Sequence, residues 1–405
     1  MKYGNGTRHR AAAALGVLLA ASVTLTACGG DPSGSAAEKS EKSAKSAGAP
    51  GTSAKPVEDP VVVTYDGGLY VLDGRTLKVA EDIPLKGFNR VNPAGDDRHV
   101  MVSTATGFQV MDAVGRRLTD VEFKGPKPGH VVHHAGSTVL FSDGTGEVTV
   151  FDPEDLGDTR PKSETYGSAA PHHGVAIRLA NGELVTTLGT EEKRVGITVL
   201  GADREEVTRS EKCPGVHGEA TAKDEAVVIG CEDGVLVYKD GAIKKVESPT
   251  EYGRVGNQAG SDESPVVLGD YKKDKDAELE RPEQVSLIDT RSGKMRLVDI
   301  GTSYTFRSLA RGPHGEALVL GTDGKIHVID PETGKVTRKI SVLGPWQEPL
   351  DWQQPRPALF VRDHTAYVSD PSGKKLLAID IESGERLAST RLPQSPNEVS
   401  GVKGH

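Results

Sequence analysis

Three histidines, His130, His173 and His217, recur at the same point of a repeated pattern of short strands. Each lies 8 to 10 residues before the next strand-like run of its unit. Imidazole nitrogens bind Zn²⁺ at about 2.0–2.1 Å, and three of them leave one tetrahedral position open. Protons and competing ligands displace imidazole from zinc. The pattern therefore indicates a zinc site that can release its metal again, although imidazole also suits copper and nickel.

Several neighbours bear on this site. His172 adjoins His173 and competes with it for the role of ligand. Glu219 lies two residues after His217, on the same side of the expected strand, and is either a fourth ligand or an acceptor that orients a ring. The structural alternative is that His130 and His217 only cap inner strands or bond carbonyl groups. The remaining strand and turn histidines have no partner at a matched position and are expected to be packing or surface residues: His99, His314, His327 and His364.

A second metal site is a weaker hypothesis. His133 and His134 follow His130 in the sequence HVVHH, and Asp143 comes after the next strand. These three side chains could share a metal ion. Neighbouring residues of a strand face opposite ways, however, so one of the two histidines should point into the sheet.

A repeated unit must position these residues. From residue 58 onward, β-branched runs alternate with Asp-Gly turns, as in ALVLGTDG-KIHVID-PETG-KVTRKI over residues 317–340. Seven further versions bring the count to eight units. Residues 58–405 then provide about 43 residues per unit, the size of one four-stranded propeller blade.

The ends of this region predict how the ring closes. The first unit lacks an innermost strand, whereas a spare strand candidate, residues 396–402, follows the last unit. We expect the C-terminus to complete the first blade and remove the free sheet edge. An all-β, eight-bladed β-propeller is therefore predicted. The alternative has seven blades, with residues 270–281 as part of a charged insertion.

Composition supports an all-β chain and limits its partners. Among 405 residues there are 48 Gly but only 2 Trp, 9 Tyr and 7 Phe, which favours many short elements joined by turns. The formal net charge is −9, so nucleic acid is not an expected partner. The sequence contains no nucleophile elbow, phosphate-binding loop or zinc-protease motif. We therefore expect no catalytic residues and no enzyme, and we expect a monomer.

The first residues resemble an export signal. Lys2, Arg8 and Arg10 precede an apolar run that ends in Leu-Thr-Ala-Cys at Cys28, similar to a bacterial lipobox. We expect a lipoprotein signal peptide over residues 1–27, a lipidated Cys28 and a flexible linker over residues 28–57. The β-propeller domain, residues 58–405, would then be exported and lipid-anchored to the outer face of the cell membrane.

Two cysteines remain in the exported body. Cys213 precedes an innermost strand and Cys231 ends the strand after it, so a hairpin would place them side by side. An oxidising compartment favours a disulfide, which would brace the turn that carries His217. The rival interpretation makes both thiolates zinc ligands beside His217.

Four segments resemble a known family. GHVVHHAGSTVLFSDGTGEVTVF, PHHGVAI, CPGVHGEA and IGCEDGVLV, within residues 129–237, are similar to the AztD-type zinc metallochaperones. These exported β-propellers pass zinc to the solute-binding protein of an ABC zinc importer. The resemblance implies that His130, His173 and His217 bind Zn²⁺. The linker contains no histidine, which departs from family members that carry a His-rich N-terminal segment.

Two classes of function follow. The first is a lipid-anchored zinc chaperone that binds Zn²⁺ at the mouth of the propeller channel and delivers it to a solute-binding protein. The second is a membrane-tethered scaffold whose propeller face binds another protein without metal. Trp346 and Trp352 either mark such a partner surface or plug a loop. A propeller enzyme with a histidine base carries less weight.

Overall fold

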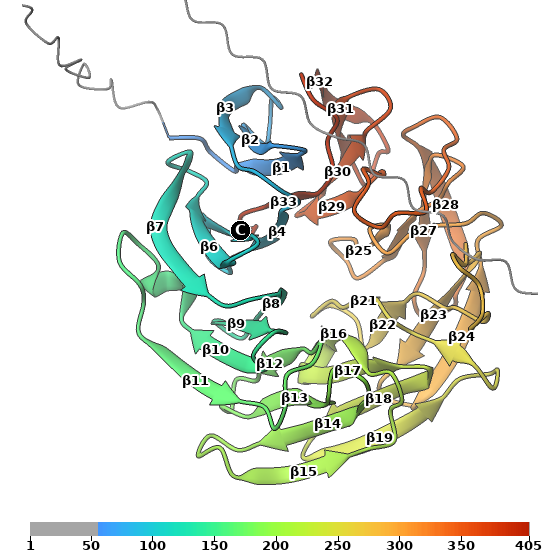
Figure 1. The fold of residues 1–405 in the computed structure, drawn as a ribbon. Helices are drawn as coiled ribbons and strands as arrows, with labels where there is room; N and C mark the ends of the chain where they lie inside the picture. The colour runs from blue at the N-terminus through green and yellow to red at the C-terminus, as the bar shows by residue number, and fades with distance from the viewer. Residues whose placement is uncertain (1–55, 405) are drawn as a thin grey trace, which may run out of the picture. The chain divides into compact units, whose positions relative to one another are not determined.

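The chain forms a ring of eight antiparallel sheets, each with four main strands (Figure 1). The computed structural model describes residues 56–404. The predicted eight-bladed propeller is confirmed, and the seven-bladed alternative is wrong. The expected signal peptide, Cys28 and nearly all of the expected linker lie outside the described residues.

The innermost strands line the centre of the ring. In blade order they are β33 (Val399–Gly401), β4 (Arg90–Pro93), β8 (Pro128–His134), β12 (Ala176–Arg178), β16 (His217–Ala222), β21 (Gln258–Ala259), β25 (Leu309–Arg311) and β29 (Leu359–Arg362). The second strands are β1 (Val61–Tyr65), β5 (His99–Ser103), β9 (Ser137–Ser142), β13 (Leu184–Gly189), β17 (Ala226–Cys231), β22 (Val266–Gly269), β26 (Ala317–Leu320) and β30 (Thr365–Asp370).

The third strands continue each blade outward. They are β2 (Gly68–Leu72), β6 (Gly107–Asp112), β10 (Glu147–Phe151), β14 (Arg194–Leu200), β18 (Asp233–Lys239), β23 (Gln284–Asp289), β27 (Lys325–Ile329) and β31 (Lys375–Asp380). The outermost strands are β3 (Val79–Pro84), β7 (Arg117–Lys124), β11 (Ser163–Gly167), β15 (Glu206–Ser210), β19 (Ala242–Glu247), β24 (Lys294–Asp299), β28 (Val336–Ser341) and β32 (Arg386–Arg391). The short β20 (Gly253–Arg254) pairs in parallel with β18.

The C-terminus closes the ring as predicted. Strand β33 pairs antiparallel with β1, with Val61 opposite Gly401 and Val63 opposite Val399. The first blade therefore combines strands from both ends of the described chain. This pairing covers the inner edge of β1, which would otherwise be open to another strand. Because the described residues, 56–404, fall within one compact unit and the ring closes within it, the propeller can be studied as a separate fragment.

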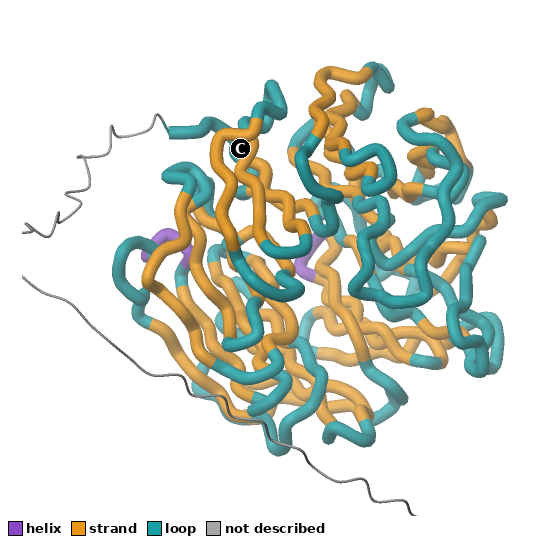
Figure 2. Tube along the Cα trace, turned by 45° about the horizontal axis from the view of Figure 1, so that its top comes forward, coloured by secondary structure: helices purple, strands orange, loops and turns teal. Residues whose placement is uncertain are grey.

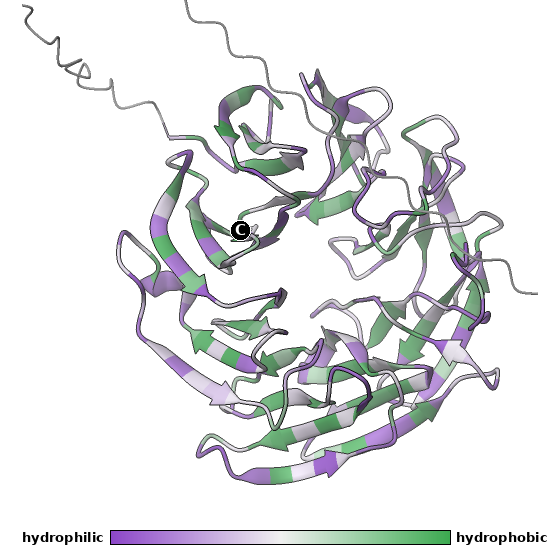
Figure 3. Ribbon diagram, viewed as in Figure 1, coloured by the Kyte–Doolittle hydropathy of each residue, from purple (hydrophilic) through white to green (hydrophobic). Residues whose placement is uncertain are grey.

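Hydrophobic side chains concentrate in the middle of each blade. Every residue of β2 and β26 is buried, whereas half-buried or buried residues alternate with exposed ones along the outermost strand β28. Figure 3 shows the same change from green middle strands to mixed outer strands. The core therefore lies between neighbouring blades, and the second and third strands hold the innermost strands in place.

The recurrent Asp turns have a local cause. In the turn between β27 and β28, the Asp330 carboxylate accepts hydrogen bonds from the backbone N–H groups of Glu332 and Thr333, both at 2.9 Å. Gly334 follows with φ +71°, a left-handed conformation that glycine adopts without strain. The turn between β31 and β32 repeats this pattern with Asp380 and Ser383.

Helical structure is limited to two short 3₁₀ turns in the described chain, at Pro153–Asp155 and Lys223–Glu225 (Figure 2). None of the helices within residues 56–404 is long and apolar enough to cross a membrane. The charged insertion, residues 270–281, is a loop between β22 and β23 inside one blade. Val57 is buried, and its N–H donates to the Val114 carbonyl at 3.1 Å.

Candidate metal centre

Three consecutive blades bring His130, His173 and His217 together. His130 lies within β8, His173 precedes β12, and His217 is the first residue of β16. One ring nitrogen of each histidine lies within 4.8 Å of a ring nitrogen of the other two. The predicted convergence of these histidines at one end of the innermost strands is therefore confirmed.

Irregular pairing turns two of these side chains toward the cluster. The register of β8 against β9 shifts between Pro128 and Val131, around His130. The register of β16 against β17 shifts between His217 and Glu219. Bulges of this kind redirect side chains and are common beside functional sites. A uniform ladder would alternate these residues between the two faces of the sheet.

Gly218 makes the second bulge possible. Its φ of +70° is in the left-handed region, and a Cβ atom there would lie 2.3 Å from Oε1 of Gln258. Both the backbone conformation and the close approach therefore require glycine. The bulge sets the direction of His217 and Glu219, which flank it.

Each imidazole has an acceptor near its Nδ1 atom. Nδ1 of His173 is hydrogen-bonded to Oδ2 of Asp143. Nδ1 of His217 donates to the carbonyl oxygen of Gly256 at 2.5 Å, and Nδ1 of His130 lies 3.5 Å from Oε2 of Glu219. These outer partners fix ring orientation and leave the Nε2 atoms for a shared ion.

The Nε2 atoms of His173 and His217 lie 3.0 Å apart. With both Nδ1–H groups committed to acceptors, the two lone pairs face each other and repel unless a proton or a metal ion lies between them. Tetrahedral ligands at about 2.0–2.1 Å from zinc are about 3.3 Å from one another. The chemistry and spacing of these donors therefore fit zinc.

Burial differs among the three rings. The His173 side chain is 41% exposed and that of His130 is 20% exposed, so solvent reaches the cluster from the side of His173. Burial lowers the pKa of His217 well below its usual range, and the neighbouring His130 and His173 act in the same direction. His217 is therefore neutral at pH 7 and can donate its lone pair.

Asp143 is held by a tight backbone. A Cβ atom on Gly129 would lie 2.1 Å from Oδ1 of Asp143, so only glycine permits this approach. The N–H of Gly174 donates to the same Oδ1 at 3.3 Å. Asp143 therefore supports His173 from outside the cluster.

The predicted disulfide is present. Cys213 and Cys231 are bonded, with their Cα atoms 4.9 Å apart, and both are fully buried. The N–H of Glu232, next to Cys231, donates to the carbonyl oxygen of Pro214 at 2.8 Å. The disulfide and this hydrogen bond therefore tie the segment before His217 to the end of β17. The alternative role of the cysteines as thiolate ligands is wrong.

His172 does not join the cluster. Its side chain is buried, with Nδ1 2.9 Å from the Ala170 carbonyl oxygen and Nε2 2.9 Å from Oγ1 of Thr187. Its ring also packs edge-on against Phe141. Both nitrogens are therefore occupied, and His173 supplies the ring that faces His217.

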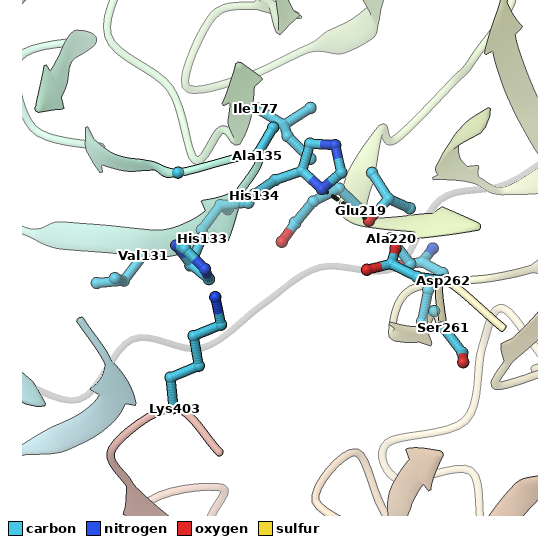
Figure 4. A pocket seen from close by; sticks show the side chains of 15 residues that line it. Val131, His133, His134, Ala135, Ile177, Glu219, Ala220, Ser261, Asp262 and Lys403 are labelled. Carbon is cyan, nitrogen blue, oxygen red and sulfur yellow. Dashed lines mark hydrogen bonds between the residues drawn. The ribbon is translucent and has the colours of Figure 1, made fainter. Parts of the chain in front are cut away.

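The second predicted site, of His133, His134 and Asp143, does not form among the described residues. Asp143 contacts His173 instead, and Nε2 of His134 lies 2.8 Å from Oε1 of Glu225. His133 and His134 line a cavity of about 560 Å³ along the inner strands. Figure 4 shows Lys403 extending toward His133 in this cavity. Sequence order suggested the grouping, but the β9–β10 turn carries Asp143 toward the other end of the strands.

Glu219 connects the cavity with the cluster. Its side chain lines the cavity (Figure 4), and its Oε2 atom lies 3.5 Å from Nδ1 of His130. Of the two roles predicted for Glu219, the geometry favours the acceptor that orients a ring, because its carboxylate lies beside Nδ1 of His130 and is not part of the group formed by the three histidines.

The other histidines divide into two kinds. His99 and His327 are buried and pair with Asp96 and Asp323, as expected of packing residues. His314 and His364 are exposed but meet at Glu382. Aligning the starts of the innermost strands in the sequence did not reveal this second cluster. A comparison of turns could have found it, because both histidines occupy the hairpin after an innermost strand.

Comparison with known proteins agrees with this architecture. The chain is 25% identical to the zinc chaperone AztD of Citrobacter koseri over 304 residues, which cover 73% of this chain and 70% of that protein. The chain resembles AztD. The resemblance expected from residues 129–237 is thus confirmed, and it extends far beyond them.

The fold of AztD is also shared. The structure of apo AztD from Citrobacter koseri superimposes with a TM-score of 0.73 at 22% identity, covering 85% of this chain and 96% of that one. A second crystal structure of Citrobacter koseri AztD gives a TM-score of 0.72. Residues 281–405 match a family model described as outer membrane protein assembly factor BamB. This match covers only the last blades.

Proposed function

We propose that this protein is a zinc chaperone that binds one Zn²⁺ through His130, His173 and His217. The observation that carries the proposal is the opposed pair of Nε2 atoms of His173 and His217, 3.0 Å apart. Three imidazoles leave one position open on a tetrahedral zinc ion. The similarity to AztD, a protein named as a zinc chaperone, supports the same conclusion.

The open position gives zinc a route out. Because the His173 side chain is more exposed than that of His130, an incoming ligand can approach the metal from the side of His173. Such a ligand can take the fourth position first and then replace the imidazoles one at a time. We propose that this ligand belongs to the solute-binding protein of an ABC zinc importer, and that the propeller acts as a carrier, not as an enzyme.

The same face offers a surface for a partner. The loop between β28 and β29 leads into an innermost strand, as the segments carrying His130 and His173 do. It exposes Leu350 (65%) and Trp352 (52%), and Trp352 packs edge-on against Phe88 with 5.2 Å between ring centroids. The Nε1–H group of Trp346, in contrast, donates a hydrogen bond to the Gly321 carbonyl oxygen, which fixes this ring against the blade. Exposed aromatics favour protein contacts, which also keeps the metal-free scaffold as the second candidate function.

A transfer assay tests the chaperone. The zinc-loaded fragment 53–405 is mixed with the apo solute-binding protein in the presence of excess chelator, and zinc on each protein is measured with time. Direct transfer predicts that the solute-binding protein fills despite the chelator. Zinc that passes only to the chelator, at the rate of unassisted release, would contradict transfer.

We further propose that Cys28 is lipidated and anchors a monomer to the outer face of the cell membrane. The lipobox-like sequence that ends at Cys28 supports this. Cell fractionation of the full chain and of Cys28→Ser tests it. The wild type should sediment with membranes and the variant should not, while identical distributions would argue against the anchor.

A further inference from the structure

A second group of metal-binding side chains lies on blades formed by β25–β28 and β29–β32. It consists of His314, His364 and Glu382. His314 lies in the turn between β25 and β26, His364 between β29 and β30, and Glu382 between β31 and β32. The turns of His314 and His364 follow innermost strands, and in an antiparallel four-stranded blade the β31–β32 turn of Glu382 lies at that same end. His130, His173 and His217 instead lie near the beginnings of their innermost strands. The two groups therefore lie on opposite faces of the ring.

The three ligand atoms are already close. Oε1 of Glu382 lies 3.1 Å from Nε2 of His314 and 3.1 Å from Nδ1 of His364. All three atoms fall within 4.8 Å of one another. Ligands of a tetrahedral zinc ion are about 3.3 Å apart. The two histidine–Glu382 separations are therefore within a few tenths of an ångström of this spacing.

Backbone contacts hold the three turns. The N–H of Ile381 donates to the carbonyl of His364 at 2.9 Å, which joins two of the turns directly. The guanidinium of Arg338 donates to the carbonyl oxygens of Ile381 and Glu382. The N–H of His314 donates to Oε2 of Glu316 at 3.0 Å. Side-chain rotation is therefore the main freedom that a metal ion must remove.

Exposure sets the character of this group. The side chains of His314, His364 and Glu382 are 67%, 52% and 57% exposed. Water can thus complete the coordination of an ion, and the ion can exchange directly with solvent. Two histidines and one carboxylate form a known three-ligand zinc set that leaves a position open.

We infer that His314, His364 and Glu382 form a second zinc site, weaker than the central one and independent of it. Zinc displaces the His314–Glu382 hydrogen bond and the His364–Glu382 ion pair and binds Nε2 of His314, Nδ1 of His364 and Oε1 of Glu382. Each imidazole binds as the neutral tautomer whose single proton lies on the nitrogen away from the ion, Nδ1 of His314 and Nε2 of His364. A proton carried by a binding nitrogen beforehand passes to solvent. This site does not depend on the proposed function of the central histidines.

A matched pair of variants tests the second site. Glu332 occupies the corresponding position of the preceding blade, in Asp-Pro-Glu-Thr-Gly against Asp-Ile-Glu-Ser-Gly, and its side chain is 55% exposed. It pairs with Arg291 and not with histidine. Glu332→Gln therefore removes the same charge from the same kind of turn without removing an inferred ligand.

The experiment is a competition titration of the apo fragment 53–405 with Zn²⁺ and a chromophoric chelator. The wild type should bind two zinc ions in two affinity classes. Glu382→Gln and His314→Ala should weaken the second class at least about tenfold, and Glu332→Gln and His217→Ala should leave it unchanged. Anomalous scattering at the zinc edge from zinc-soaked crystals should place the second ion at Glu382.

Three results would overturn the second site: binding of one zinc only by the wild type, an unchanged second class in Glu382→Gln and His314→Ala, or equal weakening by Glu332→Gln. Loss of the tighter class alone in His217→Ala concerns the central site. The two inferences therefore fail separately.

Discussion

His173 and His217, from neighbouring blades, point their Nε2 atoms at each other across 3.0 Å. Their Nδ1 atoms are bonded outward, to Asp143 and to the carbonyl of Gly256. Two segments that are 44 residues apart in the sequence thus supply two of the four ligands of a tetrahedral site.

Asp143→Asn should weaken zinc binding without removing a ligand. The amide keeps the size of the carboxylate but loses the charge that raises the basicity of His173, so we expect about a 10–100-fold rise in Kd for zinc. Competition titration measures it. Asp152→Asn, in a 3₁₀ turn away from the site, is the control, and equal Kd values for all three proteins would contradict this role of Asp143.

The adjacent residues His172 and His173 should separate stability from binding. His173→Gln removes a half-exposed ligand and should abolish tight zinc binding with little change in the apo melting temperature. His172→Gln removes both bonds of a buried ring and should lower stability by about 1–3 kcal/mol, with tight zinc binding retained. Thermal unfolding and zinc titration of both variants decide this, and a reversed pattern would assign the ligand to His172.

The disulfide should stabilise the fold without being needed for zinc binding. Replacing Cys213 and Cys231 by Ser removes a cross-link over 18 residues of sequence separation, which the loop-entropy model values at about 3 kcal/mol. Urea unfolding of the apo fragment measures the loss. Retention of one zinc ion by the folded double variant is expected, since neither sulfur is a ligand; its loss in a folded variant would show otherwise.

Acid should destabilise the apo fragment through buried histidines. Burial lowers the pKa values of His133, His217 and His327, whereas unfolded histidine titrates near about 6.5. Below that pH the unfolded chain binds more protons, so the stability present above pH ~6.5 is lost as pH falls toward the lowered values. Urea unfolding of zinc-free fragment between pH 7.5 and 5 should show this decline.

The matched variant for the pH experiment is His327→Gln. His327 is fully buried and away from the zinc cluster, so its replacement should make the pH dependence shallower. A wild-type stability that stays constant from pH 7.5 to 5 would be inconsistent with the three lowered pKa values.

The fold could be predicted because its signals are local and repeated. Turns built on Asp and Gly recur along the chain, most regularly at Asp289–Gly293, Asp330–Gly334 and Asp380–Gly384, and β-branched runs lie between them. Counting these units indicates eight blades, and the unpaired strand near Val399 indicates how the ring closes. The matched positions of His130, His173 and His217 follow from the same counting.

Glu219 was predicted as a ring-orienting acceptor, but the partners of His173 and His217 could not be predicted in this way. Asp143 reaches His173 across a blade boundary, and only Gly129 and the following turn make room for it. The Gly256 carbonyl carries no side-chain signal at all. Contacts between blades depend on bulges and turn geometry, which the spacing of residues along the chain does not encode.

Zinc titration of the apo fragment 53–405, wild type beside His217→Ala, tests the central claim most directly. With Glu382→Gln added to both proteins, only the central cluster is measured. The account predicts about one tightly bound zinc ion for the protein with His217 and none for the protein without it, both remaining folded by circular dichroism. Equal tight binding by the two folded proteins, or none by either, would contradict a zinc site built from His130, His173 and His217.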